Sequence, residues 1–348
     1  MQRIETRGGP RERGLQQGEA VRGLALPWME RVFGRLCQRF GAASADDLVA
    51  RLAPAVRRWR DRTAAAYPEG LAEYEGLAQG LGVDGDRYMT LVFSYMISDA
   101  GPRCTVVAAR DSAGAATFAK TDDIELQDLG MNTLEVARPD VGHAHVHLHF
   151  AGTPWSVAGM NETGLAMGMT GIPGPELDRD GVFSLLALHT VLPACATVDE
   201  AIDHVRGLRL NAYGFSLMVG DASGQVALLE KSGAGMSATP LTAGTPLAHT
   251  NHVLDPDLAS RSPAQVEPIH TNGARRLRNA RRLLADGVSP ERIVADRSAE
   301  GAICQRGEDG LHTDFGVLFR PAERALRLWP GYPDEVGAED LDVAALLG

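Results

Sequence analysis

Apolar residues recur at every third or fourth position through most of the first hundred residues, which is the spacing of amphipathic helices. In the segment ALPWMERVFGRLCQRF, apolar side chains at positions 26, 29, 32, 33, 36 and 40 form such a stripe. We expect residues 11 to about 100 to be helical. The first helix contains this stripe, and three more helices follow at about 46–67, 69–82 and 86–97. Asp46 or Asp47 is expected to cap the second helix, and Pro54 to kink it.

The pattern changes to that of strands at Cys104. The sequence CTVVAARDSAGAATFAKTDD predicts two strands joined by a turn at Asp111–Gly114. Further strands are predicted at 131–139, 143–152, 155–171, 215–221 and 225–232, two helices at 184–208, a helix with outward-facing arginines at 274–295, and a hairpin at 314–333. Blocks of helices and strands without regular alternation indicate an α+β fold.

Composition excludes several classes of function. The 348 residues carry a net charge of -11, and no basic patch with interleaved aromatic residues is present, so we expect no nucleic-acid partner. The charged N-terminal sequence lacks the apolar core of a secretory signal, and no run of about 18 apolar residues predicts a membrane span. We therefore expect a cytoplasmic protein without a membrane partner.

Four cysteines, at positions 37, 104, 195 and 304, are too dispersed to suggest a disulfide framework or a zinc knuckle. Cys37, Cys195 and Cys304 are interpreted as core residues. Cys104 differs because it stands where the helical pattern ends and the first strand begins. This boundary divides the chain into a helical N-terminal segment, 1–103, and a β-rich core, 104–348.

A cysteine that becomes the first residue of a chain has a useful chemical property. Its free α-amine has an ordinary pKa of about 7.7–8.0 and can act as the general base for its own thiol. Before cleavage, the same thiol can attack the carbonyl carbon of residue 103, and hydrolysis of the resulting thioester frees the amine. Arg103–Cys104 is thus a candidate cleavage site.

Ordered motifs along nearly the whole chain support this interpretation. They are Gly9-Pro-Arg-Glu-Arg-Gly14-Leu-Gln-Gln-Gly18, Cys104-Thr105, Lys120-Thr-Asp122-Asp123, Gly159-Met-Asn161-Glu-Thr-Gly164, Phe215-Ser-Leu-Met-Val-Gly220-Asp, Leu229-Glu230, His249-Thr250-Asn251-His252 and Asp314-Phe-Gly-Val-Leu-Phe319. In these motifs the sequence resembles the acyl-coenzyme A:6-aminopenicillanic acid acyltransferase family of the N-terminal-nucleophile (Ntn) hydrolase superfamily. The resemblance implies a four-layer αββα sandwich, with residues 1–103 as an α-subunit and 104–348 as a β-subunit after self-cleavage.

The resemblance also implies roles for individual residues. Cys104 would be the nucleophile, Asp122 would orient its α-amine, and Asn251 would donate to the oxyanion. A hairpin that turns near Gly114 returns its second strand to the level of Cys104, which suits Asp122. The alternative, Asp123, would face the opposite way on the strand.

Two further assignments come from the resemblance. Arg306 is expected to be a distal arginine that shapes the site, with Gln305 as a competing choice. The family often has a small residue before the nucleophile, where this sequence has the bulky Arg103, so self-cleavage is a separate prediction from the identity of the nucleophile.

The segment GHAHVHLHF places His143, His145, His147 and His149 on one face of a strand, an arrangement that can bind a metal. No acidic or cysteine partner adjoins them in the sequence. We interpret them as a half-exposed strand face, and we expect neither a metal nor a cofactor.

The leading functional hypothesis is a self-processing cysteine Ntn hydrolase that cleaves a small amide, N-acyl or peptide-like bond through an acyl-Cys104 intermediate. The alternative is an acyl- or aminoacyl-transferase of a secondary-metabolite pathway, and a non-enzyme alternative is an inactive scaffold that uses the histidine strand. The expected assembly is an α/β heterodimer from one precursor, with a homodimer of precursors left open. The sequence does not identify the substrate-binding residues.

Overall fold

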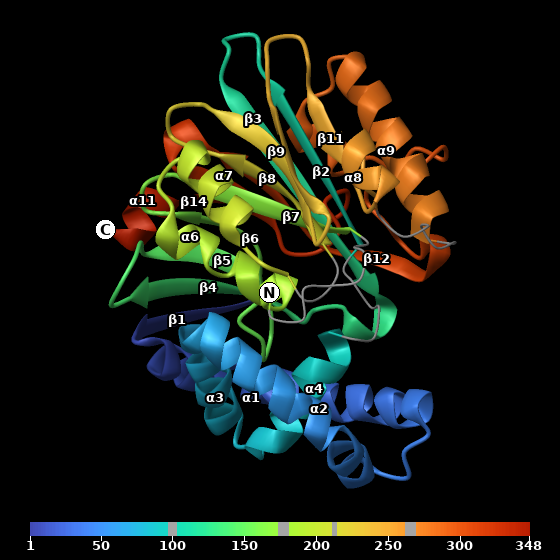
Figure 1. The fold of residues 1–348 in the computed structure, drawn as a ribbon. Coiled ribbons are helices and arrows are strands. Elements are labelled where there is room, and N and C mark those ends of the chain that lie inside the picture. The colour runs from blue at the N-terminus through green and yellow to red at the C-terminus, as the bar shows by residue number, and fades with distance from the viewer. Residues whose placement is uncertain (97–102, 173–180, 211–213, 262–268) are drawn as a thin grey trace.

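Two β-sheets stacked face to face form the centre of the molecule (Figure 1). The computed structural model describes residues 1–96, 103–172, 181–210, 214–261 and 269–348. Within these residues, the larger sheet has the order β1-β4-β5-β6-β7-β8-β9-β10, and the smaller has the order β11-β2-β3-β12-β13-β14. The sheets meet mainly through β2 and β3 of the smaller sheet and β7 and β8 of the larger.

The strands of the larger sheet are β1 (Gln2–Gly8), β4 (Asn132–Pro139), β5 (His145–Phe150), β6 (Ser156–Asn161), β7 (Ala166–Ile172), β8 (Gly214–Gly220), β9 (Val226–Ser232) and β10 (Gly235–Pro240). Those of the smaller sheet are β2 (Arg103–Arg110), β3 (Ala116–Glu125), β11 (Leu247–His249), β12 (Leu311–Arg320), β13 (Ala325–Trp329) and β14 (Glu339–Asp342). The β2–β3 and β12–β13 hairpins confirm the two hairpins predicted from the sequence.

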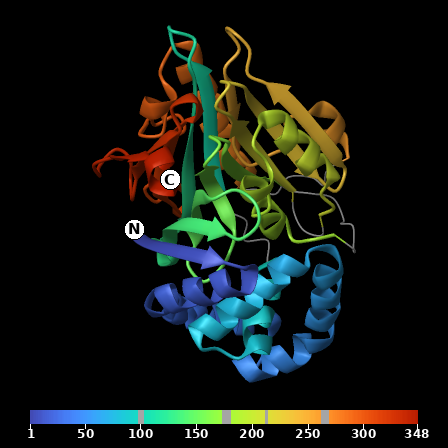
Figure 2. The same ribbon diagram turned by 90° about the vertical axis from the view of Figure 1, so that its left-hand side faces the viewer.

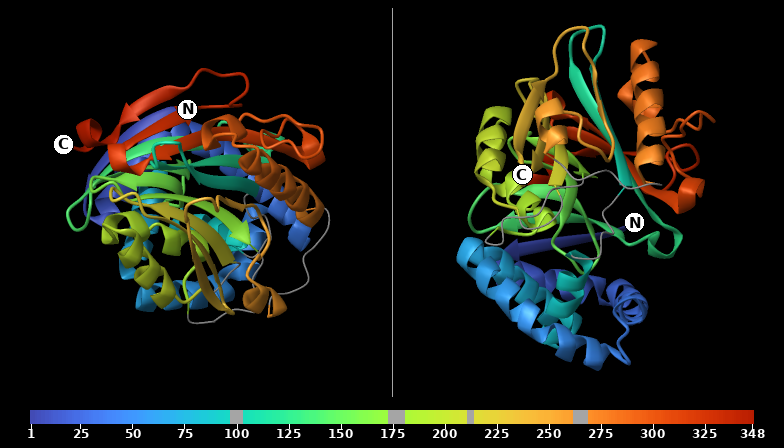
Figure 3. Two further views of the ribbon diagram at one scale, coloured as in Figure 1. Left: turned by 90° about the horizontal axis from the view of Figure 1, so that it is seen from above. Right: turned by 45° about the vertical axis from the view of Figure 1, so that its right-hand side comes forward.

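Helices cover the outer faces of both sheets. Three short helices, α5 (Ser184–Leu188), α6 (Val191–Ala194) and α7 (Val198–Gly207), pack on the larger sheet, whereas α9 (Ile269–Ala285) and α10 (Pro290–Ile293) pack on the smaller. The right-hand view of Figure 3 shows the yellow-green helices and the orange α9 on opposite sides of the strands. The remaining helices, α8 (Pro256–Ser260) and α11 (Val343–Leu347), contact strand β10 and strands β4, β5, β13 and β14, respectively. This arrangement confirms the expected αββα layers.

The N-terminal helices form a block at one end of the sandwich (Figure 2). They are α1 (Pro10–Phe40), α2 (Ala45–Ala66), α3 (Pro68–Leu81) and α4 (Gly85–Met96), close to the predicted ranges. The predicted cap of α2 was wrong, because the residue in extended conformation before the helix is Ser44, whose hydroxyl accepts the N–H of Asp47. Strand β1, for which we had no prediction, pairs in parallel with β4 and anchors the N-terminal segment to the larger sheet.

Glycines allow α1 and α3 to approach closely. A Cβ atom on Gly14 of α1 would lie 2.2 Å from the carbonyl oxygen of Glu73 on α3, and one on Gly76 of α3 would lie 2.1 Å from that of Arg11. Real Cβ atoms do not approach backbone oxygens so closely, so any side chain at these positions would push the two helices apart. The first glycine motif of the sequence therefore has a packing role.

Other element boundaries also differ from the predictions. Two helices were expected at 184–208, but three short ones form there, of which the last is capped by the Thr197 side chain, which accepts the N–H of Glu200. The helix expected at 274–295 begins earlier and ends at Ala285, because Gly287 adopts a left-handed conformation and Pro290 starts a new turn. Among the described residues, no helix combines the length and apolar character that a membrane span requires.

The interpretation of the histidine strand as half-exposed was wrong. His145, His147 and His149 of β5 are all buried, because β5 is an interior strand of the larger sheet and the N-terminal segment covers this face of it. An acidic partner also exists, since Glu135 of the neighbouring strand β4 lies directly opposite His147. Sequence proximity could not reveal this pairing across two strands.

Candidate active site

Cys104 is the second residue of β2, and its partner in the β2–β3 ladder is Asp122. Directly opposed residues of antiparallel strands project from the same face. The hairpin therefore returns Asp122 to the level of Cys104, as expected from its turn near Gly114. Neither side chain has appreciable exposed surface.

A buried lysine completes the surroundings of the thiol. Cys104 Sγ lies 3.4 Å from Asp122 Oδ1, to which it donates, and 3.3 Å from Lys120 Nζ, which donates to the sulfur. Lys120 Nζ also lies 2.6 Å from Asp122 Oδ1. The sulfur thus lies between a proton acceptor and a positive charge, an arrangement that can take up the thiol proton and stabilise a thiolate.

The pKa shifts of Cys104 and Lys120 indicate a protonated thiol beside a charged ammonium group. Burial raises the pKa of the Cys104 thiol far above its usual range, and the Lys120 ammonium only partly offsets this effect. Burial alone would lower the pKa of Lys120, but Asp122 and the thiol outweigh it, so the pKa is raised and the ammonium stays charged. In the uncut chain the thiol is therefore protonated at neutral pH, beside a permanent positive charge.

The side chain of Asn251 contacts the backbone nitrogen of Cys104, the candidate nucleophile. Its Oδ1 accepts the Cys104 N–H at 3.1 Å, while its Nδ2 donates to Gly171 O at 3.0 Å. Asn251 lies two residues after the end of β11, whose His249 pairs with Val106 of β2, and this pairing fixes its position. The structure therefore places Asn251 beside the backbone nitrogen of Cys104 and Asp122 beside its thiol. The predicted oxyanion role of Asn251 and amine-orienting role of Asp122 stay predictions.

An arginine of α9, not foreseen from the sequence, holds this region together. Arg276 Nη1 donates to Cys104 O at 2.6 Å, and Nη2 donates to Asn251 Oδ1 at 2.8 Å. Its side chain is 1% exposed. The expectation that the arginines of this helix face outward was therefore wrong for Arg276.

The structure does not bring Arg306 to this group. Its guanidinium is half-buried, forms ion pairs with Asp334 and Glu335, and stacks on the ring of Tyr332. The competing choice, Gln305, is buried and accepts a hydrogen bond from Asn272, which in turn accepts one from Arg276. Gln305 is thus linked to Cys104 through two intermediate side chains.

Asp123 faces away from the thiol, as the alternation of side chains along a strand requires. Its carboxyl accepts a hydrogen bond of 2.6 Å from Thr313 and lies 3.8 Å from Arg276. Burial raises its pKa to about 6, although Arg276 opposes the shift. Of the two adjacent aspartates, only Asp122 contacts Cys104.

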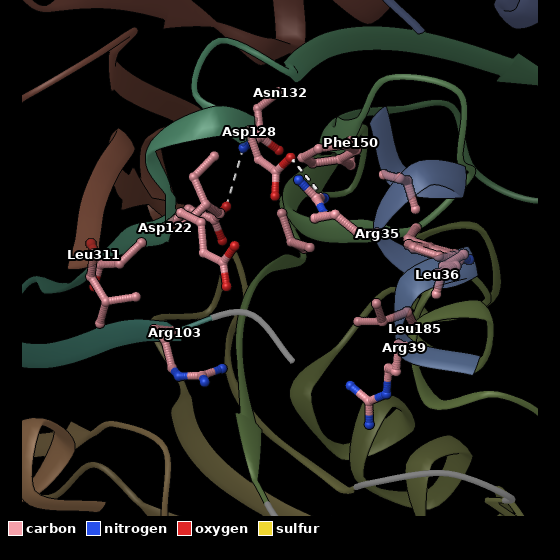
Figure 4. Close-up of a pocket in the computed structure, with 16 residues that line it drawn as sticks. Arg35, Leu36, Arg39, Arg103, Asp122, Asp128, Asn132, Phe150, Leu185 and Leu311 are labelled. Atoms are coloured by element: carbon pink, nitrogen blue, oxygen red, sulfur yellow. Dashed lines mark hydrogen bonds and ion pairs between the residues drawn. The ribbon is translucent and has the colours of Figure 1, made fainter. Parts of the chain in front are cut away.

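A cavity of about 260 Å³ opens beside this group (Figure 4). Asp122 and Arg103 line one side of it, and Arg35, Leu36 and Arg39 of α1 project toward it from the other. Much of the remaining wall is apolar and includes Phe150, Trp155, Val157, Leu185 and Leu311. The cavity thus lies between the N-terminal segment and the core, and it reaches the carboxyl group that contacts the thiol.

Sequence reasoning missed Lys120, Arg276 and Asn132, whose Nδ2 donates to Asp122 Oδ2 at 3.1 Å. A signal was present for the first two. Lys120 is one of only two lysines beside 32 arginines in the chain, and it lies two residues before Asp122, on the same strand face. Arg276 falls on the apolar stripe of its helix, four residues before the buried Ala280.

Comparisons with solved structures found similar chains of low sequence identity. They include a conjugated bile acid hydrolase mutant from Clostridium perfringens (12% identity, 68% of this chain and 96% of that chain covered, TM-score 0.44) and an N-acylethanolamine-hydrolyzing acid amidase ortholog from Caenorhabditis elegans (13%, 68% and 100%, 0.45). A third is penicillin V acylase from Agrobacterium tumefaciens (14%, 70% and 89%, 0.41). No curated protein matches the sequence significantly.

The sequence profile of the acyl-coenzyme A:6-aminopenicillanic acid acyl-transferase family matches residues 110–334, nearly two thirds of the chain. The match begins six residues after Cys104 and includes Asp122, Asn251 and Arg276. The chain therefore belongs to this family of acyl-transferases.

Proposed function

We propose that this protein is a self-processing cysteine hydrolase that cleaves a small amide, N-acyl or peptide-like bond through an acyl-Cys104 intermediate. The observation that carries the proposal is the position of Cys104 Sγ between Lys120 Nζ and Asp122 Oδ1, with the Cys104 N–H held by Asn251. Of the four cysteines, Cys104 alone combines these contacts with a position at the start of a strand.

Self-cleavage would begin with the uncut chain. Cys104 Sγ attacks the carbonyl carbon of Arg103, and Asp122 accepts the thiol proton. The Arg103–Cys104 C–N bond breaks as its nitrogen gains a proton, which leaves a thioester between Arg103 and the sulfur. Water then hydrolyses the thioester to give the Arg103 carboxylate, the free thiol and the α-amine of Cys104.

The cleaved enzyme would use the same Cys104 sulfur to attack a substrate, with the new α-amine as the base. The α-amine takes the thiol proton while Asn251 Oδ1 holds the nitrogen in place, and Lys120 stabilises the sulfur as it becomes negative. Attack on the substrate carbonyl releases the amine product and leaves acyl-Cys104, which water hydrolyses. Asn251 Nδ2 donates one of its two hydrogens to Gly171 O and would donate the other to the oxyanion.

The cavity suggests where the substrate binds. Its apolar wall suits an acyl or aromatic group, and its volume is near the lower end for small-molecule sites. Arg103 lines the cavity in the uncut chain, and cleavage would release it from Cys104 and open a path to the sulfur. Self-cleavage would thus both create the base and uncover the nucleophile.

The two products of self-cleavage would stay together as an α/β heterodimer. Strand β1 of the N-terminal segment is paired with β4 of the core over seven residues, and α1 supplies part of the cavity wall. Loss of the N-terminal segment would remove both the edge strand and one side of the cavity.

The experiment that tests the proposal traps the acyl group. The purified protein is mixed with chromogenic N-acyl anilides of increasing acyl size, quenched in acid and digested for peptide mass spectrometry. We expect an acyl adduct on the peptide that begins with Cys104, and a loss of kcat of at least about 10³-fold in Cys104→Ala. Cys37→Ala, which removes a thiol of α1 outside the site, is the matched control and should keep full activity.

Unchanged activity in Cys104→Ala, or an adduct on another residue, would overturn the proposal. Transfer instead of hydrolysis is the second candidate, favoured by the acyl-transferase name of the family whose profile matches. A primary amine added with a thioester donor distinguishes the two, because a transferase forms the amide in preference to the free acid.

A further inference from the structure

Glu135 of β4 and His147 and His149 of β5 form a buried group in the larger sheet, separate from the contacts of Cys104. Glu135 Oε2 lies 3.4 Å from His147 Nε2 and 3.0 Å from His149 Nε2, and the ligand atoms of the three residues all lie within 4.8 Å of one another. Each side chain is at most 3% exposed. Three polar atoms therefore converge on one point from which water is excluded.

The hydrogen bonds of His149 accommodate a proton on its Nδ1. Its Nδ1 lies 3.2 Å from the carbonyl oxygen of Phe150, which can only accept. With Nδ1 as this donor, Nε2 of the neutral imidazole carries a lone pair. The lone pair lies 3.0 Å from Glu135 Oε2 and 3.1 Å from the amide Nε2 of Gln17, which also lies 3.1 Å from Nδ1.

A chain of hydrogen bonds that begins at Glu73 places the proton of the neutral His147 ring on its Nδ1. His189 Nε2 lies 3.0 Å from Glu73 Oε2, so Nε2 donates, and Nδ1 of the neutral ring accepts from Ser156 Oγ at 3.0 Å. Ser156 then accepts from His147 Nδ1 at 2.7 Å. His147 Nε2 is thus left without a proton, and it is a buried atom with no hydrogen-bond partner.

In these tautomers two imidazole lone pairs and one carboxylate oxygen face one another, and a cation between them would remove their repulsion. We propose that Glu135, His147 and His149 bind one divalent transition-metal ion of the zinc type. Zinc–ligand bonds of about 2.0–2.1 Å in a tetrahedron place neighbouring ligand atoms about 3.3 Å apart, close to the 3.0 and 3.4 Å found here.

The hydrogen bonds made by the other polar atoms of these three side chains are of the kind found around metal sites. Each histidine donates its other ring N–H to an oxygen, and Glu135 Oε1 accepts the hydroxyl proton of Thr6, which leaves Oε2 for the metal. Neutral imidazole is the form that binds metals.

The fourth ligand position lies toward α1. Gln17 Nε2 is 2.9 Å from Glu135 Oε2, and the buried Gln17 Oε1 has no hydrogen-bond partner. Rotation of the amide by half a turn would bring Oε1 to the metal and close the site. Since Thr6, Gln17 and Glu73 all belong to residues 1–103, the ion would fasten the N-terminal segment to the core, whether or not the chain is cut.

The test measures bound metal in the full chain expressed in medium supplemented with Zn²⁺ or Co²⁺ and purified through a chelator column. We expect about one metal ion per chain by elemental analysis, and visible d–d bands of four-coordinate Co²⁺ without thiolate charge transfer. His149→Gln should lose the metal, whereas His143→Gln, a partly exposed histidine of the same motif, should keep it. Ser156→Ala, which removes an outer contact, should weaken Zn²⁺ binding about 10–100-fold.

Metal content well below one ion per chain in the parent would overturn the proposal and favour a protonated His189, which reverses the hydrogen-bond chain and places a proton on His147 Nε2. Thiolate charge transfer in the Co²⁺ protein, or equal metal content in His149→Gln, would also overturn it. If His149→Gln does not fold, the Co²⁺ spectrum of the parent still decides, because the ligands proposed at this site offer nitrogen and oxygen atoms and no thiolate.

Discussion

Lys120 is the residue on which the chemistry of the Cys104 thiol depends most directly. It has no exposed surface, and it contacts both the sulfur and Asp122. A buried ammonium is costly unless it is paired, so its presence here indicates a use other than stability alone. Its effect on the sulfur can be separated from its effect on folding.

Replacement of Lys120 with Met removes the positive charge and keeps most of the side-chain volume. We expect the rates of self-cleavage and turnover to fall about 10²-fold or more, because the developing thiolate loses its cation. The unfolding free energy should fall by about 3 kcal/mol, since Asp122 loses its buried partner. Cleavage is followed on denaturing gels, and stability by urea unfolding.

Lys231→Met is the matched control, because it removes the other lysine, whose Nζ contacts Arg206 O away from the thiol. It should cleave at the parent rate. Unchanged cleavage in Lys120→Met as well would show that the ammonium does not act on the sulfur.

Asp123 gives stability a dependence on pH. Burial raises its pKa to about 6 in the folded chain, above the value for an unfolded aspartate, so the folded state binds this proton more tightly. The stabilisation is complete below about pH 4 and is lost as the pH rises through 6, and it amounts to at most about 3 kcal/mol. Asp123→Asn should remove this part of the decline in urea unfolding between pH 4 and 7. An identical decline in Asp123→Asn and in the exposed variant Asp286→Asn would contradict the account.

At the scale of elements, the contact between α1 and α3 depends on glycines. Gly14→Ala would place a methyl group against the carbonyl of Glu73, and we expect the unfolding free energy to fall by about 1–3 kcal/mol. Gly34→Ala lies on the exposed side of the same helix, where a Cβ meets nothing, and should raise it by about 0.5–1 kcal/mol. Thermal unfolding of both variants tests the pair, and equal shifts of the same sign would refute the packing role.

An element was predicted well where it depends on residues close together in the sequence, and poorly where it depends on contacts between residues far apart in the sequence. The helices of residues 10–96 and the β2–β3 hairpin follow from local periodicity and turn chemistry, which also place Asp122 opposite Cys104. The apolar stripe of α9 signals the burial of Arg276, but its contact with Cys104 could not be foreseen, because the two residues are 172 positions apart. The burial of the histidine strand was missed for the same reason, since distant segments cover it.

At the scale of the whole molecule, the N-terminal segment is part of the enzyme. It contributes an edge strand to the larger sheet, one side of the cavity, and the residues that surround Glu135. The family profile begins at residue 110, so neither this segment nor Cys104 falls within the match. The account of self-cleavage therefore depends on the geometry around Cys104.

The most direct test is the mass of the purified protein under denaturing conditions, measured beside Cys104→Ala. The account predicts two chains from the parent, residues 1–103 and 104–348, and one intact chain of about 37.1 kDa from the variant. A parent that stays whole after prolonged incubation would contradict it, because Cys104 would then have no free α-amine to act as its base.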